Sequence, residues 1–474
     1  MTSFSYSTDQ IMSRNLDEQI AKLFFACNLP FNIADHPVFR ETIQMLRPGY
    51  SPPNRKDIGG HLLDQVHEKI ASNVSTELQG KEVVLIQDGW SDIHNTPVIA
   101  TSLQCEGKSY ILSAVDAGTN KKTAAYCTSV AQEAISTATE QYQCTVTGVV
   151  TDNEKMVAMK QNLHDSNPEL TVYGCSAHWL NLLGQDITPA QVINQVVEIN
   201  KYFRNHHIPG PCYLKYPIHS VKPQLPAETR WNSQLTCIDT YIRNRPYMPM
   251  IIAKNEELID PRIRSIIHNV GLFNEVKHLQ LQLQPVSNGL NRLQSDSSTL
   301  ADACETWIDL LQNSDLQTYK DKVHHRFQKA MTPTHYLANI LHSQYRGKLL
   351  LPDQVSSAQD LLLQTNPDML PDDLLSFMTD SLEISNTLLP ASVITRTRPT
   401  VWWLSLSKSS PVSKDLCSLA QKILKMPSSS ASIERVFFNF GLIQTKLRNR
   451  LGLQKAAKLV FSYWYLRGKE DIDW

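Results

Sequence analysis

A chain of 474 residues with 42% apolar residues is long enough for two to four folded domains of ordinary size. Nine cysteines without CxxC pairs, no signal-peptide pattern and no apolar run near ~18 residues exclude a secreted disulfide framework and a membrane span, so we expect a soluble intracellular protein. The formal net charge of -1 argues against a uniformly basic nucleic-acid-binding protein, but segments 201–245 and 421–474 are basic, whereas 349–395 has no Lys or Arg.

The first 79 residues are predicted to form an N-terminal helical region. Apolar residues recur there at helical spacing in two stretches, on either side of a loop rich in proline and glycine at 48–53. The two stripes are Ile20, Leu23, Phe24 and Cys27, then Leu63, Val66 and Ile70.

From residue 81 the pattern changes to short apolar runs typical of strands. Three strands, a helix, a strand, a helix and a further strand follow one another, which is the order of an RNase H-like core. We expect the first part of that core over residues 80–188. Its expected elements are strands at 82–86, 98–103 and 110–115, a helix at 123–142, a strand at 146–150, a helix at 154–163, a strand at 170–173 and a helix opening near His178.

The helix that should complete this core does not follow directly. A mostly helical region with proline-containing breaks runs from about 189 to 410, and the last helical segment starts after Pro427 and ends near Tyr465. We therefore expect an α/β fold in which an RNase H-like mixed-sheet core is interrupted by an all-helical insertion at 189–410 and completed at 411–474.

Three acidic residues accompany this pattern: Asp88 in DGWSD, Asp152 in TDNEKM and Glu434 in SSSASIERVF. Side chains just past the carboxyl ends of parallel strands face the crevice where open α/β sheets bind ligands. Each aspartate alone is also typical of a strand-end turn or a helix cap. Glu434 does not fit a capping box, because the residue three positions before it is Ala431. Hard cations prefer carboxylate oxygens, and phosphoryl transfer uses two of them, so the order Asp, Asp, Glu favours a metal site.

Two further motifs each allow an ordinary and a functional interpretation. Cys175 and His178 are either packed residues near the sheet edge, or His178 donates a hydrogen bond to a reacting phosphate. No second pair lies at zinc-finger spacing, so a structural zinc is not expected. Trp231 is either a core aromatic or an exposed ring on which a displaced base stacks, which is worth about 1–3 kcal/mol. The adjacent Arg230 favours the second interpretation.

The last helix carries an apolar stripe that is either core or, at the end of a chain, a subunit interface. Basic residues lie beside it and could contact a DNA backbone. The stripe is Leu453, Ala457, Val460, Phe461 and Trp464, and the basic residues are Lys446, Arg448, Arg450, Lys455 and Lys458.

Together these segments resemble the hAT superfamily of DNA transposases and proteins derived from them. The matching stretches are LPFNIADHPVF with RPGYSPPNR, DGWSD, VTDNEKM, CSAHWLNLL, ETRWNS and PSSSASIERVFFNFGLIQTKLRNRL. The resemblance implies an RNase H-like catalytic core with a large helical insertion and a C-terminal dimerisation region. It also implies a metal-binding triad of Asp88, Asp152 and Glu434, with auxiliary active-site positions at Cys175, His178 and Trp231.

The function implied is cleavage and strand transfer of nuclear DNA at transposon ends, dependent on Mg²⁺ or Mn²⁺, by a homodimer or higher homo-oligomer. In that scheme the freed hydroxyl of the flanking DNA attacks the opposite strand and closes a hairpin. His178 contacts phosphate, and Trp231 steadies a flipped base. The alternative is a domesticated, catalytically silent dimer that binds DNA or protein partners in the nucleus.

The sequence departs from the family at its start. Family members usually begin with a BED-type zinc finger, whereas Cys27 is the only cysteine before Leu29. We expect either a truncated chain or loss of that module. DNA binding would then depend on basic residues that contact phosphates rather than bases, among them Arg230, Lys446, Arg448 and Arg450.

Overall fold

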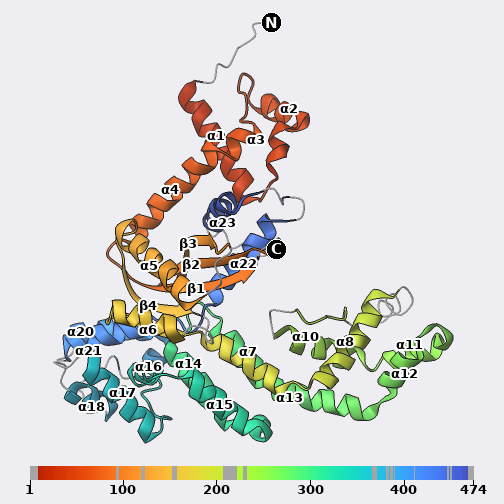
Figure 1. Cartoon of the computed structure of the whole chain (residues 1–474), viewed down its shortest axis with the longest axis vertical. Coiled ribbons are helices and arrows are strands. Elements are labelled where there is room, and N and C mark those ends of the chain that lie inside the picture. The colour runs from red at the N-terminus through yellow and green to blue at the C-terminus, as the bar shows by residue number, and fades with distance from the viewer. Residues whose placement is uncertain are drawn as a thin grey trace. The chain divides into compact units, whose positions relative to one another are not determined.

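A computed structural model of the chain describes residues 9–91, 95–118, 123–151, 157–206, 221–227, 232–365, 371–379, 384, 388, 390–409, 412–445, 448 and 451–467 (Figure 1). The chain divides into two compact units: unit 1 combines residues 1–173 with 430–474, and unit 2 comprises residues 174–429. The fold is mixed α/β, and its five-stranded sheet is in unit 1. Five of the residues singled out above lie outside the described residues: Asp152, Arg230, Trp231, Lys446 and Arg450.

The N-terminal part of unit 1 is helical, as the apolar spacing predicts. Asp9 caps the first helix by accepting a hydrogen bond from the backbone N–H of Met12 at 2.6 Å. In the first stripe Ile20 and Phe24 are buried, whereas Leu23 and Cys27 are exposed; the second stripe, which includes Val66, is buried. The elements are α1 (Gln10–Ala26), η1 (Phe31–Asp35), α2 (Pro37–Leu46), α3 (Arg55–Ile58) and α4 (His61–Leu78).

The sheet of unit 1 has the strand order β3-β2-β1-β4-β5. Strands β1, β2 and β3 pair antiparallel, whereas β4 pairs parallel with β1. Glu106 and Gly107 both have positive φ, 51° and 84°, which suits the tight turn between β2 and β3. The elements are β1 (Glu82–Ser91), β2 (Pro97–Cys105), β3 (Lys108–Asp116), α5 (Ala124–Glu140), β4 (Thr145–Thr151), α6 (Val157–Ser166) and β5 (Thr171–Gly174).

The end of the chain returns to this sheet. Helix α22 (Ala431–Ile443) packs against β1, β2 and β3, and α23 (Leu453–Arg467) packs against β3, α1 and α4. Helix α5 covers the other face, where the Gln87 side-chain amide donates to the backbone carbonyl of Cys127 at 3.1 Å. The sheet therefore lies between α5, which connects β3 to β4, and α22, which comes from the far end of the chain.

Part of the apolar stripe of α23 is buried within the chain, whereas Leu453, Ala457 and Trp464 are half-buried. Val460 and Phe461 are buried, and the Phe461 ring centroid lies 4.7 Å from that of His67 on α4. At the edge of this contact Lys458 pairs with Asp64 at 2.5 Å. Of the two interpretations of the stripe, the structure therefore supports core packing for Val460 and Phe461.

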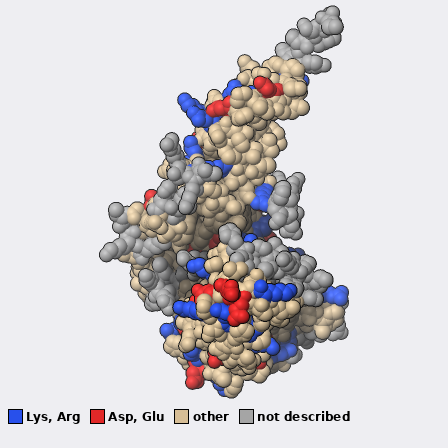
Figure 2. All heavy atoms as spheres, turned by 90° about the vertical axis from the view of Figure 1, so that its right-hand side faces the viewer, with Lys and Arg blue, Asp and Glu red and all other residues tan. Residues whose placement is uncertain are grey.

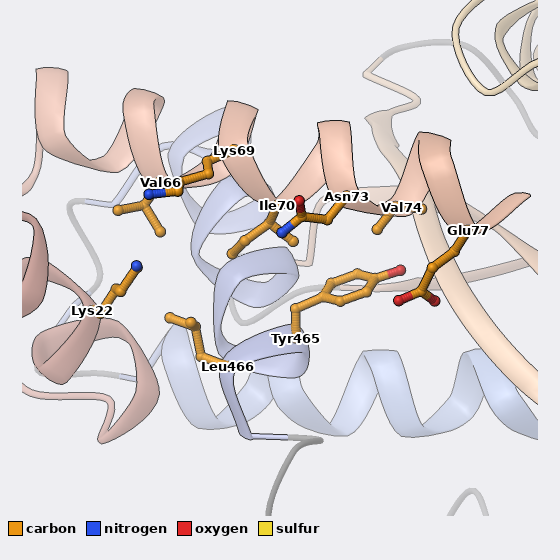
Figure 3. A pocket seen from close by; sticks show the side chains of 9 residues that line it. All are labelled: Lys22, Val66, Lys69, Ile70, Asn73, Val74, Glu77, Tyr465 and Leu466. Atoms are coloured by element: carbon orange, nitrogen blue, oxygen red, sulfur yellow. The ribbon is translucent and has the colours of Figure 1, made fainter.

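Helices α1, α4 and α23 leave one cavity of about 280 Å³ between them (Figure 3). Val66 and Ile70 of α4 line its wall. At one end Lys22 and Lys69 both pair with the same carboxylate oxygen of Glu18, at 2.5 and 2.8 Å. The hydrogen bonds from the two ammonium groups lower the pKa of Glu18. Lys22 pairs with Glu18 within α1, whereas Lys69 ties α4 to α1 beside the cavity.

From Ser176 onward, every regular element among the described residues of unit 2 is a helix. Helix α7 packs against α13, so it belongs with this unit, which extends beyond the insertion expected at 189–410. The elements are α7 (Ser176–Ile187), α8 (Ala190–Asn205), α10 (Asn232–Asn244), α11 (Met248–Lys254), η2 (Glu256–Leu258), α12 (Pro261–His268), α13 (Val270–Leu293), α14 (Leu300–Gln312), η3 (Ser314–Tyr319), α15 (Lys320–Ala330), α16 (Pro333–Leu341), α17 (Pro352–Thr365), α18 (Pro371–Met378), α19 (Ala391–Arg396), α20 (Pro399–Ser409) and α21 (Lys414–Ile423).

Basic and acidic side chains are mixed on the side of unit 2 formed by α8, α11 and α12. Arg262 pairs with Glu198 at 3.0 Å, and Arg264 pairs with Glu256 at 2.8 Å. Figure 2 looks at this side and shows a group of acidic side chains with basic ones around it. Attraction of a nucleic-acid backbone would require a uniformly basic surface, and this face carries charges of both signs.

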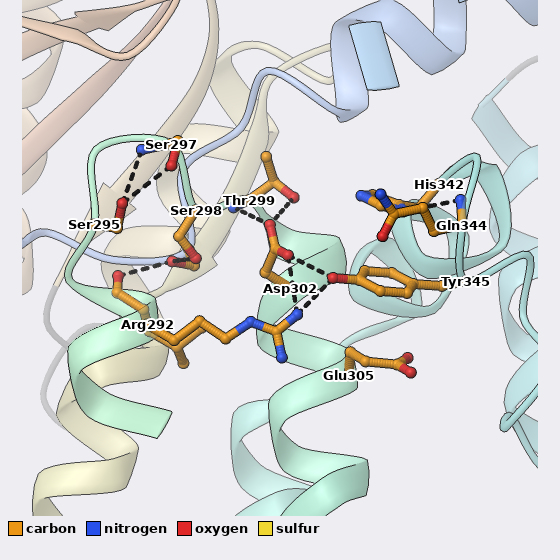
Figure 4. A network of polar contacts seen from close by, with 12 residues as sticks. Arg292, Ser295, Ser297, Ser298, Thr299, Asp302, Glu305, His342, Gln344 and Tyr345 are labelled. Atoms are coloured by element: carbon orange, nitrogen blue, oxygen red, sulfur yellow. Dashed lines mark hydrogen bonds and ion pairs between the residues drawn. The ribbon is translucent and has the colours of Figure 1, made fainter. Parts of the chain in front are cut away.

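A polar network fixes the corner between α13 and α14 (Figure 4). Arg292 pairs with Asp302 at 3.2 Å, and the Tyr345 hydroxyl donates to the same carboxylate at 2.7 Å. Burial alone would raise the pKa of Asp302, but hydrogen bonds from Tyr345 and the backbone of Thr299 outweigh it and lower that pKa. The His342 ring stacks on Tyr345 with centroids 3.9 Å apart.

The same corner holds the chain segment that precedes α22. The backbone N–H of Leu300 donates to the carbonyl of Met426 at 3.1 Å, and that of Ser428 donates to the carbonyl of Ser298 at 3.1 Å. The hydroxyl of Ser429 donates to the carbonyl of Leu293 at 2.6 Å. The serine run therefore satisfies backbone groups at the end of α13.

We predict that His342 makes the stability of unit 2 depend on pH. Burial, the largest cause, lowers the pKa of His342 to about 4. The pKa of an unfolded histidine is near 6.5. Between about pH 6.5 and 4 the unfolded chain therefore binds one more proton than the folded chain, and the free energy of unfolding decreases as the pH is lowered. His342→Phe keeps a ring against Tyr345 and should remove up to about 3 kcal/mol of that loss, measured by urea unfolding at pH 7 and 4.5.

The matched control is His325→Phe on α15, where the histidine is exposed. This variant should retain the pH dependence of the unchanged chain. An identical loss of stability in His342→Phe and the unchanged chain would show that His342 is not the titrating group.

Candidate active site

Asp88 is the first residue of β1 beyond its parallel pairing with β4. In the register of the two strands Gln87 is opposite Thr151, the last residue of β4, whereas β1 continues to Ser91 paired with β2 alone. Asp88 is the next residue after that last parallel pair, and Asp152 directly follows Thr151 in sequence. Carboxyl ends of adjacent parallel strands form the ligand-binding edge of an open α/β sheet. The register thus puts the end of β4 beside Asp88.

Trp90 marks the face of the sheet to which Asp88 belongs. Its ring stacks on Phe437 of α22 with centroids 4.2 Å apart, and lies 5.0 Å from Phe440. Side chains two residues apart on a strand point to the same face, so Asp88 shares the α22 face with Trp90. The Asp88 carboxylate accepts a hydrogen bond from the backbone N–H of Gly89 at 2.7 Å.

Glu434 lies in the first turn of α22, one helical turn before Phe437. Residues three apart on a helix share a face, so Glu434 and Phe437 are on the same side of α22. The helix begins after Ser430, whose side chain makes no capping hydrogen bond, and Glu434 therefore plays no part in a capping box. The positive end of the helix dipole favours an ionised carboxylate here.

These contacts place two of the three acidic residues on elements that pack together. The stack of Trp90 on Phe437 joins the strand of Asp88 to the helix of Glu434. Asp152 lies outside the described residues, so convergence of all three carboxylates stays a prediction. Within the described part of the chain, no three His, Cys, Asp or Glu side chains are grouped so as to hold a metal ion.

His178 and Cys175 lie in unit 2, at the start of α7. Cys175 is buried and precedes the helix as its N-cap residue, without a capping hydrogen bond from its side chain. His178 is half-buried, and its ring centroid lies 6.3 Å from that of Trp179. A contact of His178 with substrate phosphate stays a prediction.

Arg448, the one described member of the basic set Lys446, Arg448 and Arg450, binds within its own chain. One Nη donates to the backbone carbonyl of Asn28 at 2.6 Å, and the other donates to the Asn28 side-chain oxygen. Asn28 follows α1 with a φ of 51°. Burial lowers the pKa of Arg448. This guanidinium therefore joins the C-terminal segment to the end of α1, and two of its donor groups are already used.

Several of these contacts have no local signal in the sequence. Trp90 sits in DGWSD, but its partners Phe437 and Phe440 are far downstream. The Asn28–Arg448 bond likewise joins opposite ends of the chain. The one available hint is that the segment after Ser430 is richer in aromatics than a short exposed helix needs.

Comparison with known families assigns a class to this arrangement. Residues 53–202 match a domain of unknown function (DUF659), and residues 379–465 match the hAT family C-terminal dimerisation region. No curated protein matches the chain. The first match contains Asp88, Asp152 and His178, and the second contains Glu434. Together the two matches support a transposase-like protein.

More particularly, the two matches support a hAT-family transposase-like protein, as the sequence motifs predict. The dimerisation region supports homodimer formation. Among the described residues, none of the helices combines the length and the apolar character that crossing a bilayer would require.

We predict that Arg448→Gln destabilises the protein. The substitution removes charge-assisted hydrogen bonds to Asn28 that a shorter, neutral side chain cannot replace, and such bonds are worth about 1.5–3 kcal/mol. Chemical denaturation should show a loss of that order in the free energy of unfolding. Lys455→Gln is the matched control, because Lys455 is exposed, and its effect should stay within about 0.5 kcal/mol. Equal stability of the two variants would contradict the structural role of Arg448.

Proposed function

We propose that the chain is a hAT-type DNA transposase that cleaves and transfers strands at transposon ends in the nucleus, in a reaction dependent on Mg²⁺ or Mn²⁺. Asp88, Asp152 and Glu434 would form its catalytic site on an RNase H-like core. The observation that carries the proposal is the packing of α22, which bears Glu434, against the face of β1 that bears Asp88.

The strand arrangement supports an RNase H-like core. Three antiparallel strands precede a helix and a fourth strand that pairs parallel with the first, and the order β3-β2-β1-β4-β5 puts β1 at the centre. The helix that completes such a core comes from the end of the chain, after the helical residues of unit 2. Asp88 and Glu434 are then contributed by the central strand and by that last helix.

The donor set fits a hard divalent cation. Asp88 and Glu434 offer carboxylate oxygens, the ligands that Mg²⁺ prefers, and Asp152 would add a third. Bound ions would activate the attacking oxygen and steady the leaving oxygen at phosphorus. The protein's own contribution is rigidity, because Trp90, stacked on Phe437, holds the helix of Glu434 against the strand of Asp88.

We predict that Asp88→Asn and Glu434→Gln each reduce metal-dependent nicking by at least ~100-fold, since a neutral amide binds a divalent cation far more weakly than a carboxylate. The assay is nicking of a supercoiled plasmid that carries the sequences flanking the gene, with Mg²⁺ or Mn²⁺. Asp165→Asn and Glu106→Gln are matched controls at exposed positions of unit 1 and should retain activity.

The assay also separates this proposal from its alternative. Nicking that survives Asp88→Asn and Glu434→Gln would overturn the catalytic assignment. A folded dimer that binds DNA but nicks no substrate with either metal would instead favour a domesticated, catalytically silent factor.

We predict that DNA binding through Lys446 and Arg450 depends on salt rather than on sequence. Phosphate contacts carry no base information, and each neutralised phosphate contributes about -0.9 to the slope of log affinity against log salt on duplex DNA. Replacing both residues with Gln should therefore weaken binding equally on unrelated duplexes and flatten the slope by about 2 in a salt titration. Tight discrimination between one end sequence and random DNA would contradict this prediction.

A further inference from the structure

Helix α22 carries exposed apolar side chains on its outer face. Phe438 is 61% exposed and Leu442 is 37% exposed, and the two lie one helical turn apart. Gly441 lies between them in sequence, and a Cβ added to it would meet nothing within 4 Å. A glycine inside a helix costs about 0.5–1 kcal/mol relative to alanine, and no packing within the described chain requires it here.

The end of α1 is hydrogen-bonded to the end of α22. The side-chain amide of Asn28 donates to the backbone carbonyl of Leu442 at 3.0 Å, which joins the C-terminal ends of the two helices. On α1, Leu23 is 49% exposed and Cys27 is also exposed, again one turn apart. We define the α22 patch as Leu23, Cys27, Phe438, Gly441 and Leu442. None of these residues is charged.

We propose that the α22 patch is the centre of the homodimer interface, and that two copies of α22 cross at Gly441 with α1 of each copy contributing Leu23 and Cys27. The inference rests on the homodimer suggested by the dimerisation region, which contains α22 but not α1. The family match does not say which residues contact the second copy. The proposal names them and includes the N-terminal helix α1 in the interface.

Three observations favour a second copy of the chain as the occupant. The buried core residues of α23, the other helix of unit 1 in the dimerisation region, pack within their own chain, whereas the outer face of α22 carries exposed apolar side chains. Interface centres are enriched in aromatic residues and their rims are polar; the patch has Phe438 at its centre, with the charged Glu434 and Arg435 one helical turn before it. A small residue at a helix crossing lets two backbones approach closely, and a two-fold interface brings the same patch from both copies together.

Substitutions on the patch test the proposal in the full-length chain. Phe438→Asp puts a charge at the centre and should raise the dimer dissociation constant by ~30-fold or more, measured by sedimentation or light scattering over a concentration series. Gly441→Trp should do the same by blocking the crossing. Met45→Asp is the matched control, because Met45 is an 84% exposed apolar residue on α2 outside the patch, and its dimer should be as tight as that of the unchanged chain.

Cross-linking gives a readout that does not depend on a loss of stability. In a Cys27→Ser background, Gly441→Cys should form a disulfide-linked dimer on mild oxidation, because the two copies of residue 441 face each other at the crossing. Met45→Cys in the same background should remain monomeric on a non-reducing gel.

The outcomes separate this inference from the proposed function. A tight dimer in both Phe438→Asp and Gly441→Trp, with no cross-link at residue 441, would overturn the patch while leaving dimerisation elsewhere intact. Weaker DNA binding with an unchanged dimer would assign the patch to DNA instead. An unchanged chain that is monomeric at micromolar concentration would overturn both the patch and the homodimer. None of these results tests metal-dependent nicking, which is tested by the substitutions of Asp88 and Glu434.

Discussion

The stack of Trp90 on Phe437 and Phe440 is the contact on which the rest of unit 1 depends. It joins the central strand of the sheet to a helix from the far end of the chain. Together with the buried Ile433 and Val436 of α22, it covers the face of β1 opposite α5 and holds the helix of Glu434 against the strand of Asp88. Aromatic pairs of this kind are worth about 0.5–1.5 kcal/mol beyond the area they bury, and their ring geometry fixes orientation as well.

The N-terminal helices are held by the same C-terminal segment. Helix α23 packs against α1 and α4, Lys458 pairs with Asp64, and Arg448 binds Asn28. Residues that look like a detachable tail in sequence are therefore part of the core of unit 1. Removing them would delete Val460 and Phe461 and expose the faces of α1 and α4 that α23 covers, so point substitutions on exposed side chains test assembly more cleanly than truncation does.

Unit 2 is stabilised by contacts of its own. The Arg292–Asp302–Tyr345 network holds the corner between α13 and α14, and the serine run at 428–429 satisfies backbone groups there. Buried polar networks of this kind specify one geometry only when every member is satisfied, because an unpaired group at such depth is costly. The insertion can thus keep its own fold while the chain on either side of it builds the sheet.

The sequence by itself determined the local elements and the order of the motifs. Period-two and helical spacing placed the strands and helices, and the sequence also showed that Ala431 excludes a capping box for Glu434. Only the tertiary structure decided that Val460 and Phe461 are core, that Arg448 binds Asn28, and that Phe438 and Leu442 face outward. The physical reason is that these contacts join residues far apart in the sequence. Spacing encodes which face of an element is apolar, but not which distant element covers that face, and the partners here are at opposite ends of the chain.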